Sequence, residues 1–234
     1  MLAAQDLTLD KQAAIGKQLA DEVRRHTAPL QSQEVQNYVM HLGARITGQL
    51  RDPAFSFTFS VVSTEEDNAL HEPLALPGGY IFVPSNLLLA ADDEAEFAGM
   101  LAQAVARAPL ALKNHARTAG TMPFMFVEGF AGDSVFPTGA FDQRREMELQ
   151  ADTSAILSMS RAGFDPAALL RYIERVQPPD RPRSPFPARA DRIAALQKAI
   201  RDLPSASYSE SDEFYAIQEQ VRPLPPSPPT LIRE

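Results

Sequence analysis

The chain has 234 residues, of which 44% are hydrophobic and 22% charged, a balance typical of a globular protein with a substantial core. Its net charge of −8 at pH 7 argues against a partner that presents a phosphate backbone, so we expect no nucleic-acid partner. The chain has no cysteine, which excludes disulfides, thiolate metal ligands and cysteine nucleophiles. Apolar runs are short, so the sequence predicts no transmembrane segment.

The first elements are two helices followed by a strand. Apolar residues recur at helical spacing over about residues 9–25, and a second helix is expected after Pro29. Between residues 55 and 61 the period changes to two, because apolar side chains alternate with Ser and Thr. This alternation predicts a strand with one buried face.

A turn, a second strand and a third helix follow. Pro77-Gly78-Gly79 predicts a turn, and residues 80–83 have the composition of a strand. A third helix is expected over about residues 92–107, ended by Pro109. Residues 110–140 are punctuated by Gly and Pro, so we expect a loop or a short hairpin there.

The remaining patterns are helical. A fourth helix is expected over about residues 142–161, closed by Gly163, and a shorter one after Pro166. Residues 188–203 and 210–221 predict two more helices. Helices outnumber strands, so the fold class expected is α+β, with a small sheet packed on helices. We expect a single domain over residues 1–222 and a Pro-rich C-terminal tail over residues 223–234.

Five segments of the chain form one ordered set of motifs: Asn68-Ala69, Ala75–Val83, Asp93–Ala102, Arg145–Asp152 and Arg161–Pro166. In this order and spacing they resemble one peptidase family. The chain resembles the gluzincin family of the HtpX heat-shock protease, the CaaX prenyl endoprotease and the periplasmic BepA protease, over roughly residues 10–203. It implies a mainly helical, zincin-like (mini-gluzincin) domain, whose small sheet packs on the helix that normally carries the zinc motif.

The family's zinc motif is degenerate in this chain. Members carry His-Glu-x-x-His on the third helix, where two histidines at i and i+4 share a face and reach one metal. At these positions the chain has Gln103 for the first histidine, Ala104 for the general base and Arg107 for the second histidine. The later positions Glu148 and Asp152 are retained. We therefore predict no metal ligation and no intact catalytic residue.

The histidines support this prediction independently of any register. They are His26, His41, His71 and His115, and the nearest two are 15 positions apart (41 − 26), so no helical two-histidine site exists. Phe186, in Ser184–Pro187, stands where the family has a further histidine. One retained ligand of three does not hold zinc. The cofactor expected of the family, zinc, is predicted to be absent.

The substitution of Arg107 suggests how the site compensates. Glu148 and Asp152 share a helix face at i and i+4, where like charges repel. We expect Arg107 to pair with one or both and so to replace the metal electrostatically. The alternative is that Arg107 caps the C-terminus of its helix, where a cation is also favoured.

The function expected is that of a pseudo-peptidase, which binds a peptide or protein client without cutting it. The family resemblance implies that substrate pairs with the strand carrying Leu76 to Val83, so the binding residues expected are Pro77, Gly78, Gly79, Tyr80 and Ile81. Two alternatives stay open: a zinc endopeptidase that uses Gln103, Glu148 and His115, and an accessory subunit of an active homologue. The oligomeric state is open.

The compartment is also open from the sequence. The resemblance implies a periplasmic or secreted protein. The N-terminal residues lack the charged start and apolar stretch of a signal peptide. The sequence therefore does not separate a trimmed, exported protein from a cytoplasmic one.

Overall fold

A computed structural model describes residues 9–51, 53, 55–63, 71–115, 138–178, 180, 186–204, 206–208 and 211–222, with the side chains of 111–115 and 138–143 excepted. Asn68-Ala69, Ser184-Pro185 and the Pro-rich tail lie outside these residues, and so does the side chain of His115.

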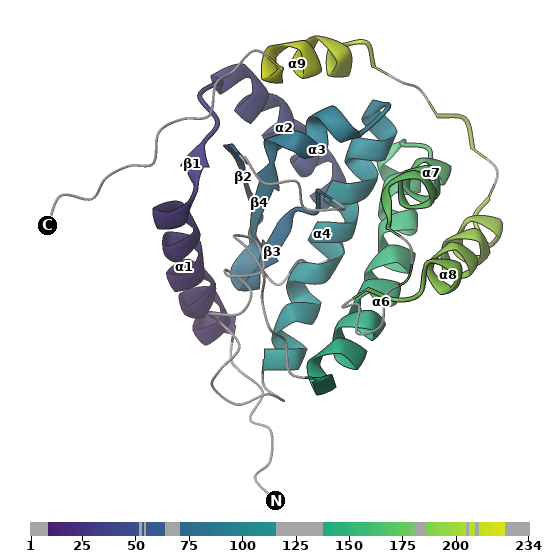
Figure 1. Ribbon diagram of the computed structural model, residues 1–234, viewed down its shortest axis with the longest axis horizontal. Helices are drawn as coiled ribbons and strands as arrows, with labels where there is room; N and C mark the ends of the chain where they lie inside the picture. The colour runs from purple at the N-terminus through teal and green to yellow at the C-terminus, as the bar shows by residue number, and fades with distance from the viewer. Residues whose placement is uncertain are drawn as a thin grey trace, which may run out of the picture.

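The described residues form a small sheet surrounded by helices (Figure 1). The elements in chain order are α1 (Leu9–His26), β1 (Ala28–Pro29), α2 (Gln33–Thr47), β2 (Thr58–Ser63), β3 (Leu74–Leu76), the 3-10 turn η1 (Pro77–Gly79), β4 (Tyr80–Pro84), α3 (Ser85–Ala90), α4 (Glu94–His115), α6 (Thr138–Ala162), α7 (Ala167–Val176), α8 (Arg189–Arg201) and α9 (Glu213–Val221).

The sheet is mixed, with the strand order β1-β2-β4-β3. β2 and β4 are parallel, with Phe59 opposite Ile81, whereas β3 and β4 are antiparallel, with Ala75 opposite Ile81. The strands lie between α1 and α4, and α6, α7 and α8 lie beyond α4 (Figure 1). The expected α+β class is thus confirmed. The sheet also packs on α4, which is the third helix that the sequence predicted, so that expectation is confirmed too.

α4 is the central helix of the fold. Its N-terminus is capped by Asp93, whose carboxylate accepts the Glu96 backbone N–H at 2.7 Å, while the Glu96 carboxylate accepts the Asp92 N–H at 2.9 Å. Almost every residue from Ala95 to Ala108 is buried. A helix covered on all sides holds its side chains rigidly, which suits it to position a site.

α6 packs along α4 and ends in a Schellman motif. Gly163 has φ of 79°, its N–H bonds the Ser160 carbonyl at 3.2 Å, and the Phe164 N–H bonds the Met159 carbonyl at 2.9 Å. The predicted closure of this helix by Gly163 is therefore confirmed. α4 and α6 lie closely side by side.

Several predicted bounds were wrong. α4 continues through Pro109 to His115. Pro109 lies on an exposed side of the helix and Ala108 on a buried one, so packing retains the helix despite the lost hydrogen bond. β2 begins at Thr58 instead of residue 55, and α6 begins at Thr138, inside the segment predicted as loop. The short helix α3 was not predicted.

The turn between β3 and β4 is held beneath α1. Gly78 and Gly79 have φ of 74° and 85°, which side chains other than glycine rarely adopt. A Cβ at Gly16 of α1 would lie 1.8 Å from the Pro77 carbonyl oxygen, so glycine permits this close approach. Among the described residues, no helix is both long and apolar enough to cross a membrane.

Candidate functional site

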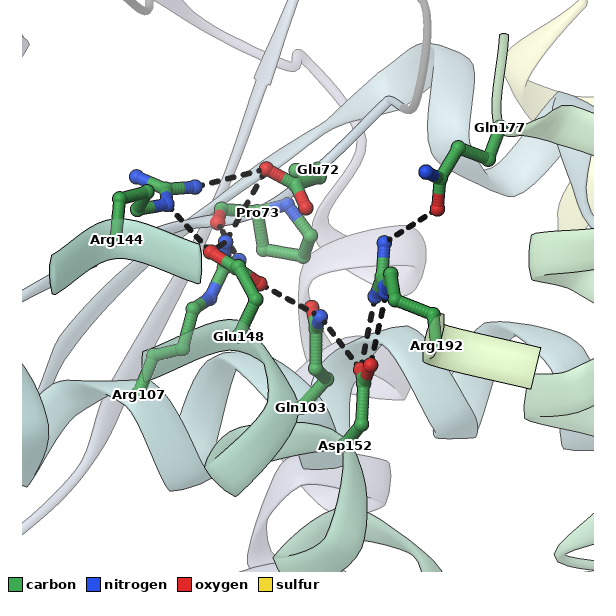
Figure 2. Close-up of polar contacts among 9 residues, drawn as sticks. All are labelled: Glu72, Pro73, Gln103, Arg107, Arg144, Glu148, Asp152, Gln177 and Arg192. Carbon is green, nitrogen blue, oxygen red and sulfur yellow. Dashed lines mark hydrogen bonds and ion pairs between the residues drawn. The ribbon is translucent and has the colours of Figure 1, made fainter. Parts of the chain in front are cut away.

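A buried polar cluster lies where α4, α6, α8 and the start of β3 meet (Figure 2). α4 contributes Gln103 and Arg107, which are four residues apart and therefore share a face. α6 contributes Arg144, Glu148 and Asp152 on one stripe by the same spacing. The remaining members are Glu72 and Pro73, before β3, with Arg192 of α8 and Gln177, after α7.

Glu148 lies at the centre of the cluster. Its Oε1 lies 3.3 Å from Arg107 NH1 and 2.5 Å from Arg144 Nε, and its Oε2 accepts from Gln103 Nε2 at 2.9 Å. The side chain is fully buried. Burial raises the pKa of Glu148, but the guanidiniums of Arg144, Arg107 and Arg192 outweigh burial and lower the pKa to about 2. Glu148 is therefore an anion at neutral pH.

Asp152 is held by a third arginine, Arg192. Arg192 donates from Nε to Oδ2 and from NH2 to Oδ1, both at 2.8 Å, which is a bidentate pair. Gln103 Nε2 also donates to Asp152 Oδ1 at 3.0 Å. Arg192 NH1 donates to Gln177 Oε1 at 3.1 Å, and both members of the ion pair are fully buried. Asp152 raises the pKa of Arg192 despite burial, so this guanidinium stays charged.

Segment 71–73 closes one side of the cluster. Arg107 NH2 donates to the Pro73 carbonyl at 2.7 Å, and Arg107 NH1 lies 3.2 Å from Glu72 Oε2. Arg144 NH2 lies 3.1 Å from the same Glu72 oxygen. His71 has φ of 50°, which is uncommon for a residue other than glycine. Arg107 thereby connects α4, α6 and the lead-in to β3.

The charges of the cluster balance. The three guanidiniums of Arg107, Arg144 and Arg192 face three carboxylates, those of Glu72, Glu148 and Asp152. Arg107 has a raised pKa because Glu148 and Glu72 outweigh the effect of burial. A buried charge is tolerated when it is paired and hydrogen-bonded, as these are.

Known proteins similar to this chain were found among proteases. No family model matches the chain. Over 252 aligned residues, 94% of the chain and 50% of the relative, it is 23% identical to a Vibrio cholerae serotype O1 protein provisionally named as a beta-barrel assembly-enhancing protease. Over 196 residues, 74% of the chain and 39% of the relative, it is 25% identical to the beta-barrel assembly-enhancing protease of Yersinia pestis. The chain is a homologue of the beta-barrel assembly-enhancing proteases.

This homologue spans half or less of the length of the curated relatives that it matches. The relationship agrees with the peptidase family that the sequence motifs indicated.

The predicted pairing of Arg107 with Glu148 is present, and the capping alternative is wrong, because α4 extends for eight residues (115 − 107) beyond Arg107. Asp152 is bound by Arg192 and Gln103. Sequence reasoning missed Arg144, Arg192 and Glu72 as members of the cluster. Two had a signal: Arg144 precedes Glu148 by four, and Arg192 precedes the buried Leu196 by four on an otherwise apolar stripe.

The strand expected at a substrate-binding edge lies inside the sheet. β4, which carries Tyr80 and Ile81, pairs with β2 on one side and with β3 on the other. Pro77, Gly78 and Gly79 form η1 under α1, where Pro77 and Gly79 are buried. The edge strand near the cluster is β3, because its three residues follow Pro73 and, within the described part of the chain, pair with β4 alone.

The residues of this homologue do not fit a zinc ion. Ala104 offers no ligand or base and is fully buried, and Arg107 places a cation where the second histidine is expected. Glu148, the retained carboxylate, already contacts three nitrogen-bearing side chains. Among the described residues, no three His, Asp or Glu side chains are grouped as metal ligands.

Proposed function

We propose that this chain is a non-catalytic homologue of the peptidases, in which an ionic cluster takes the structural place of the metal. The observation that carries the proposal is the buried contact of Arg107 with Glu148, at 3.3 Å, beside a fully buried Ala104 at the position where the resemblance leads us to expect the general base. A guanidinium can neutralise a carboxylate and join two helices. It has no vacant orbital with which to bind and activate a water molecule, as a metal does.

Neither carboxylate of α6 in the cluster supplies a base. Glu148 has a pKa lowered to about 2 and shares its proton-accepting oxygens with Arg107, Arg144 and Gln103. Asp152 is engaged by both nitrogen donors of a bidentate arginine. A general base needs a free lone pair directed at the proton that it removes. The carboxylates therefore support the fold instead of hydrolysis.

The retained activity that we propose is the binding of an extended polypeptide along β3. Leu74, Ala75 and Leu76 are buried as whole residues, at 9%, 8% and 1% exposure, so a peptide binds only where this edge opens, and it is then recognised through the main chain. Strand addition uses main-chain hydrogen bonds and tolerates many sequences. This proposal moves the binding site from Tyr80 and Ile81, which lie in the interior strand, to the neighbouring strand.

The test uses unmodified protein and two sets of probe peptides. An unfolded protein such as casein, incubated with the chain and added zinc, should stay intact. Extended fluorescent peptides should bind, and the same peptides N-methylated at every second residue should bind at least tenfold more weakly, because they lack the donors that pair with an edge. Cleavage of casein would overturn the non-catalytic assignment, and equal binding of both peptide sets would overturn the β3 site.

One observation favours the alternative of a metal site with unusual ligands. The side-chain oxygen of Gln103 is buried, with no hydrogen-bond partner in the described part of the chain. A zinc endopeptidase using Gln103, Glu148 and His115 would have to displace two guanidiniums from Glu148, which makes it the weaker proposal. Co-purification with an active homologue would support the accessory-subunit alternative.

A periplasmic location is the one that the relationship favours, and we propose it for this chain. Fractionation of the native host, with markers for each compartment, tests it directly. Recovery of the chain with the cytoplasmic marker would contradict the proposal.

A further inference from the structure

Glu72 differs from the other two carboxylates of the cluster in its position and exposure. Glu148 and Asp152 project from α6 and are fully buried, whereas Glu72 lies on the irregular segment 71–73 before β3. The Glu72 side chain is 12% exposed and that of Arg144 is 23% exposed. These two side chains are therefore more exposed than Glu148, Asp152 and Arg107.

Two guanidiniums converge on Glu72. Arg107 NH1 lies 3.2 Å and Arg144 NH2 lies 3.1 Å from the same oxygen, Oε2 (Figure 2). They reach it from different helices, α4 and α6, whose positions are fixed by the core. Arg107 is additionally held by Glu148 and the Pro73 carbonyl, and Arg144 lies over the Phe186 ring, 5.8 Å from its centre. Convergent, pre-positioned guanidiniums recognise a carboxylate strongly.

The charge balance of the cluster also distinguishes Glu72 from the other two carboxylates. The helices alone contribute three guanidiniums, from Arg107, Arg144 and Arg192, against two carboxylates, from Glu148 and Asp152. This arrangement has a net charge of +1 (3 − 2), which Glu72 neutralises. A ligand with a single negative charge satisfies the same arrangement.

We propose that Arg107 and Arg144 form a binding site for the free C-terminal carboxylate of an extended polypeptide, and that Glu72 is its internal competitor. The inference rests on the proposed binding along β3. Leu74 follows Glu72 by two residues, so a chain that pairs antiparallel with β3 reaches the guanidiniums of Arg107 and Arg144 as it passes the start of β3. A terminal carboxylate has no following residue and can therefore fit a partly buried site.

Glu72 makes the site self-occluding. A group tethered to the same chain competes at a high effective concentration, on the order of millimolar for short flexible connections. The ligand must displace Glu72 before it contacts Arg107 and Arg144, which lowers its apparent affinity. Neutralising Glu72 removes the competitor while leaving both guanidiniums in place.

The experiment compares one peptide in two forms, by calorimetry. The probe is an N-acetylated pentapeptide of alternating Ala and Leu, prepared as the free acid and as the C-terminal amide. The free acid should bind the wild-type chain more tightly than the amide. Glu72→Gln should tighten binding of the acid by roughly tenfold, equivalent to about 1.4 kcal/mol, with binding of the amide unchanged.

Two further variants separate the site from general charge effects. Adding Arg144→Gln to Glu72→Gln should abolish the gain, because one of the two guanidiniums is lost. Glu146→Gln removes an exposed carboxylate on the same helix as Arg144, and should change the affinity for neither peptide. Acetate alone should bind at least tenfold more weakly than the free acid, because it lacks the main-chain contacts with β3. Circular dichroism confirms that each variant is folded.

The outcomes are distinct. Equal binding of acid and amide, in the wild type and in folded Glu72→Gln, would overturn the carboxylate site and leave binding along β3 intact. Acetate that binds as tightly as the peptide acid would also overturn it, since recognition would then not need a polypeptide. Binding of neither peptide would overturn both this inference and the β3 proposal, while the casein assay separately tests the absence of catalysis.

Discussion

Arg107 of α4 and Glu148 of α6 face each other across a buried contact, with NH1 3.3 Å from Oε1 and side chains 5% and 0% exposed. Both residues stand at positions where the sequence resemblance leads us to expect metal ligands in a zinc peptidase. The contact provides what a metal provides to the fold, which is a positive charge that joins two helices. It lacks what a metal provides to catalysis, which is an open coordination position.

Removing the guanidinium should destabilise the protein strongly. Arg107→Met leaves Glu148 short of one charge partner and the Pro73 carbonyl without its donor, so unfolding in urea should require about 3–5 kcal/mol less free energy. Arg222→Ala is the matched control, because Arg222 pairs with Glu219 on the surface, and it should change stability by less than about 0.5 kcal/mol.

The double variant Arg107→Met/Glu148→Met should be less destabilised than the sum of its parts, because it removes the stranded charge as well. A strictly additive cycle would show that the two side chains do not interact in the folded protein.

Stability should fall on acidification through Glu148. Burial raises the pKa of Glu148, but Arg144, Arg107 and Arg192 lower it from an ordinary 4.5 to about 2. Between these values the unfolded chain binds a proton that the folded chain does not, so stability is fully present above about pH 4.5 and is lost toward pH 2. The loss attributable to this one group is on the order of 3 kcal/mol.

Urea unfolding at a series of pH values between 7 and 3 measures this dependence. Glu148→Gln should show a shallower decline than the wild type, because Gln does not titrate. Glu146→Gln, an exposed neighbour on the same helix, should follow the wild-type curve. Parallel curves for wild type and Glu148→Gln would contradict the lowered pKa.

Restoring two ligands should restore metal binding without catalysis. Gln103→His/Arg107→His places two histidines at i and i+4 opposite Glu148, which is a His₂Glu ligand set. The double variant should bind one zinc per chain by elemental mass spectrometry, and a chelator should lower its Tm. It should not cleave casein, because Ala104 remains at the position of the base. Arg107→His alone should bind zinc only weakly. If the folded double variant contained no zinc, the side chains at positions 103, 107 and 148 would not converge on one metal.

The tight contact of α1 with η1 should make Gly16 intolerant of a side chain. A Cβ there would lie 1.8 Å from the Pro77 carbonyl oxygen, so Gly16→Ala should destabilise the protein by about 1–3 kcal/mol through a shift of α1. Gln18→Ala, on the exposed face of the same helix, should be nearly neutral. An unchanged Tm for Gly16→Ala would contradict the observed packing.

Local patterns predicted most of the helices and the Arg107–Glu148 contact, because each depends on residues close in sequence or on a known motif order. The predicted end of α4 at Pro109 was wrong. A proline disfavours helix locally, but the tertiary packing that keeps α4 helical beyond Pro109 is not visible in the local sequence. The strand order could not be predicted either, because it also depends on tertiary contacts. Nothing in residues 74–83 says that β3 forms the edge and β4 the interior, because pairing partners are chosen by the whole fold.

Ion-pair partners in the buried cluster could be predicted only where they are close in the sequence. Arg144 is four residues from Glu148 and could be inferred from helix geometry alone. Arg192 and Glu72 are separated from their partners by 40 and more than 30 residues of chain, so only the assembled fold brings them to Asp152 and Arg107. Their contribution turns a predicted ion pair into a neutral network of six charges.

The central claim is that this ionic network stands in place of the metal, and the zinc content of the native chain tests it most directly. The protein is purified without chelator, equilibrated with micromolar zinc and analysed by elemental mass spectrometry, with Glu148→Gln treated in parallel. We predict zinc far below one ion per chain in both proteins. One zinc per wild-type chain, lost in folded Glu148→Gln, would contradict the claim.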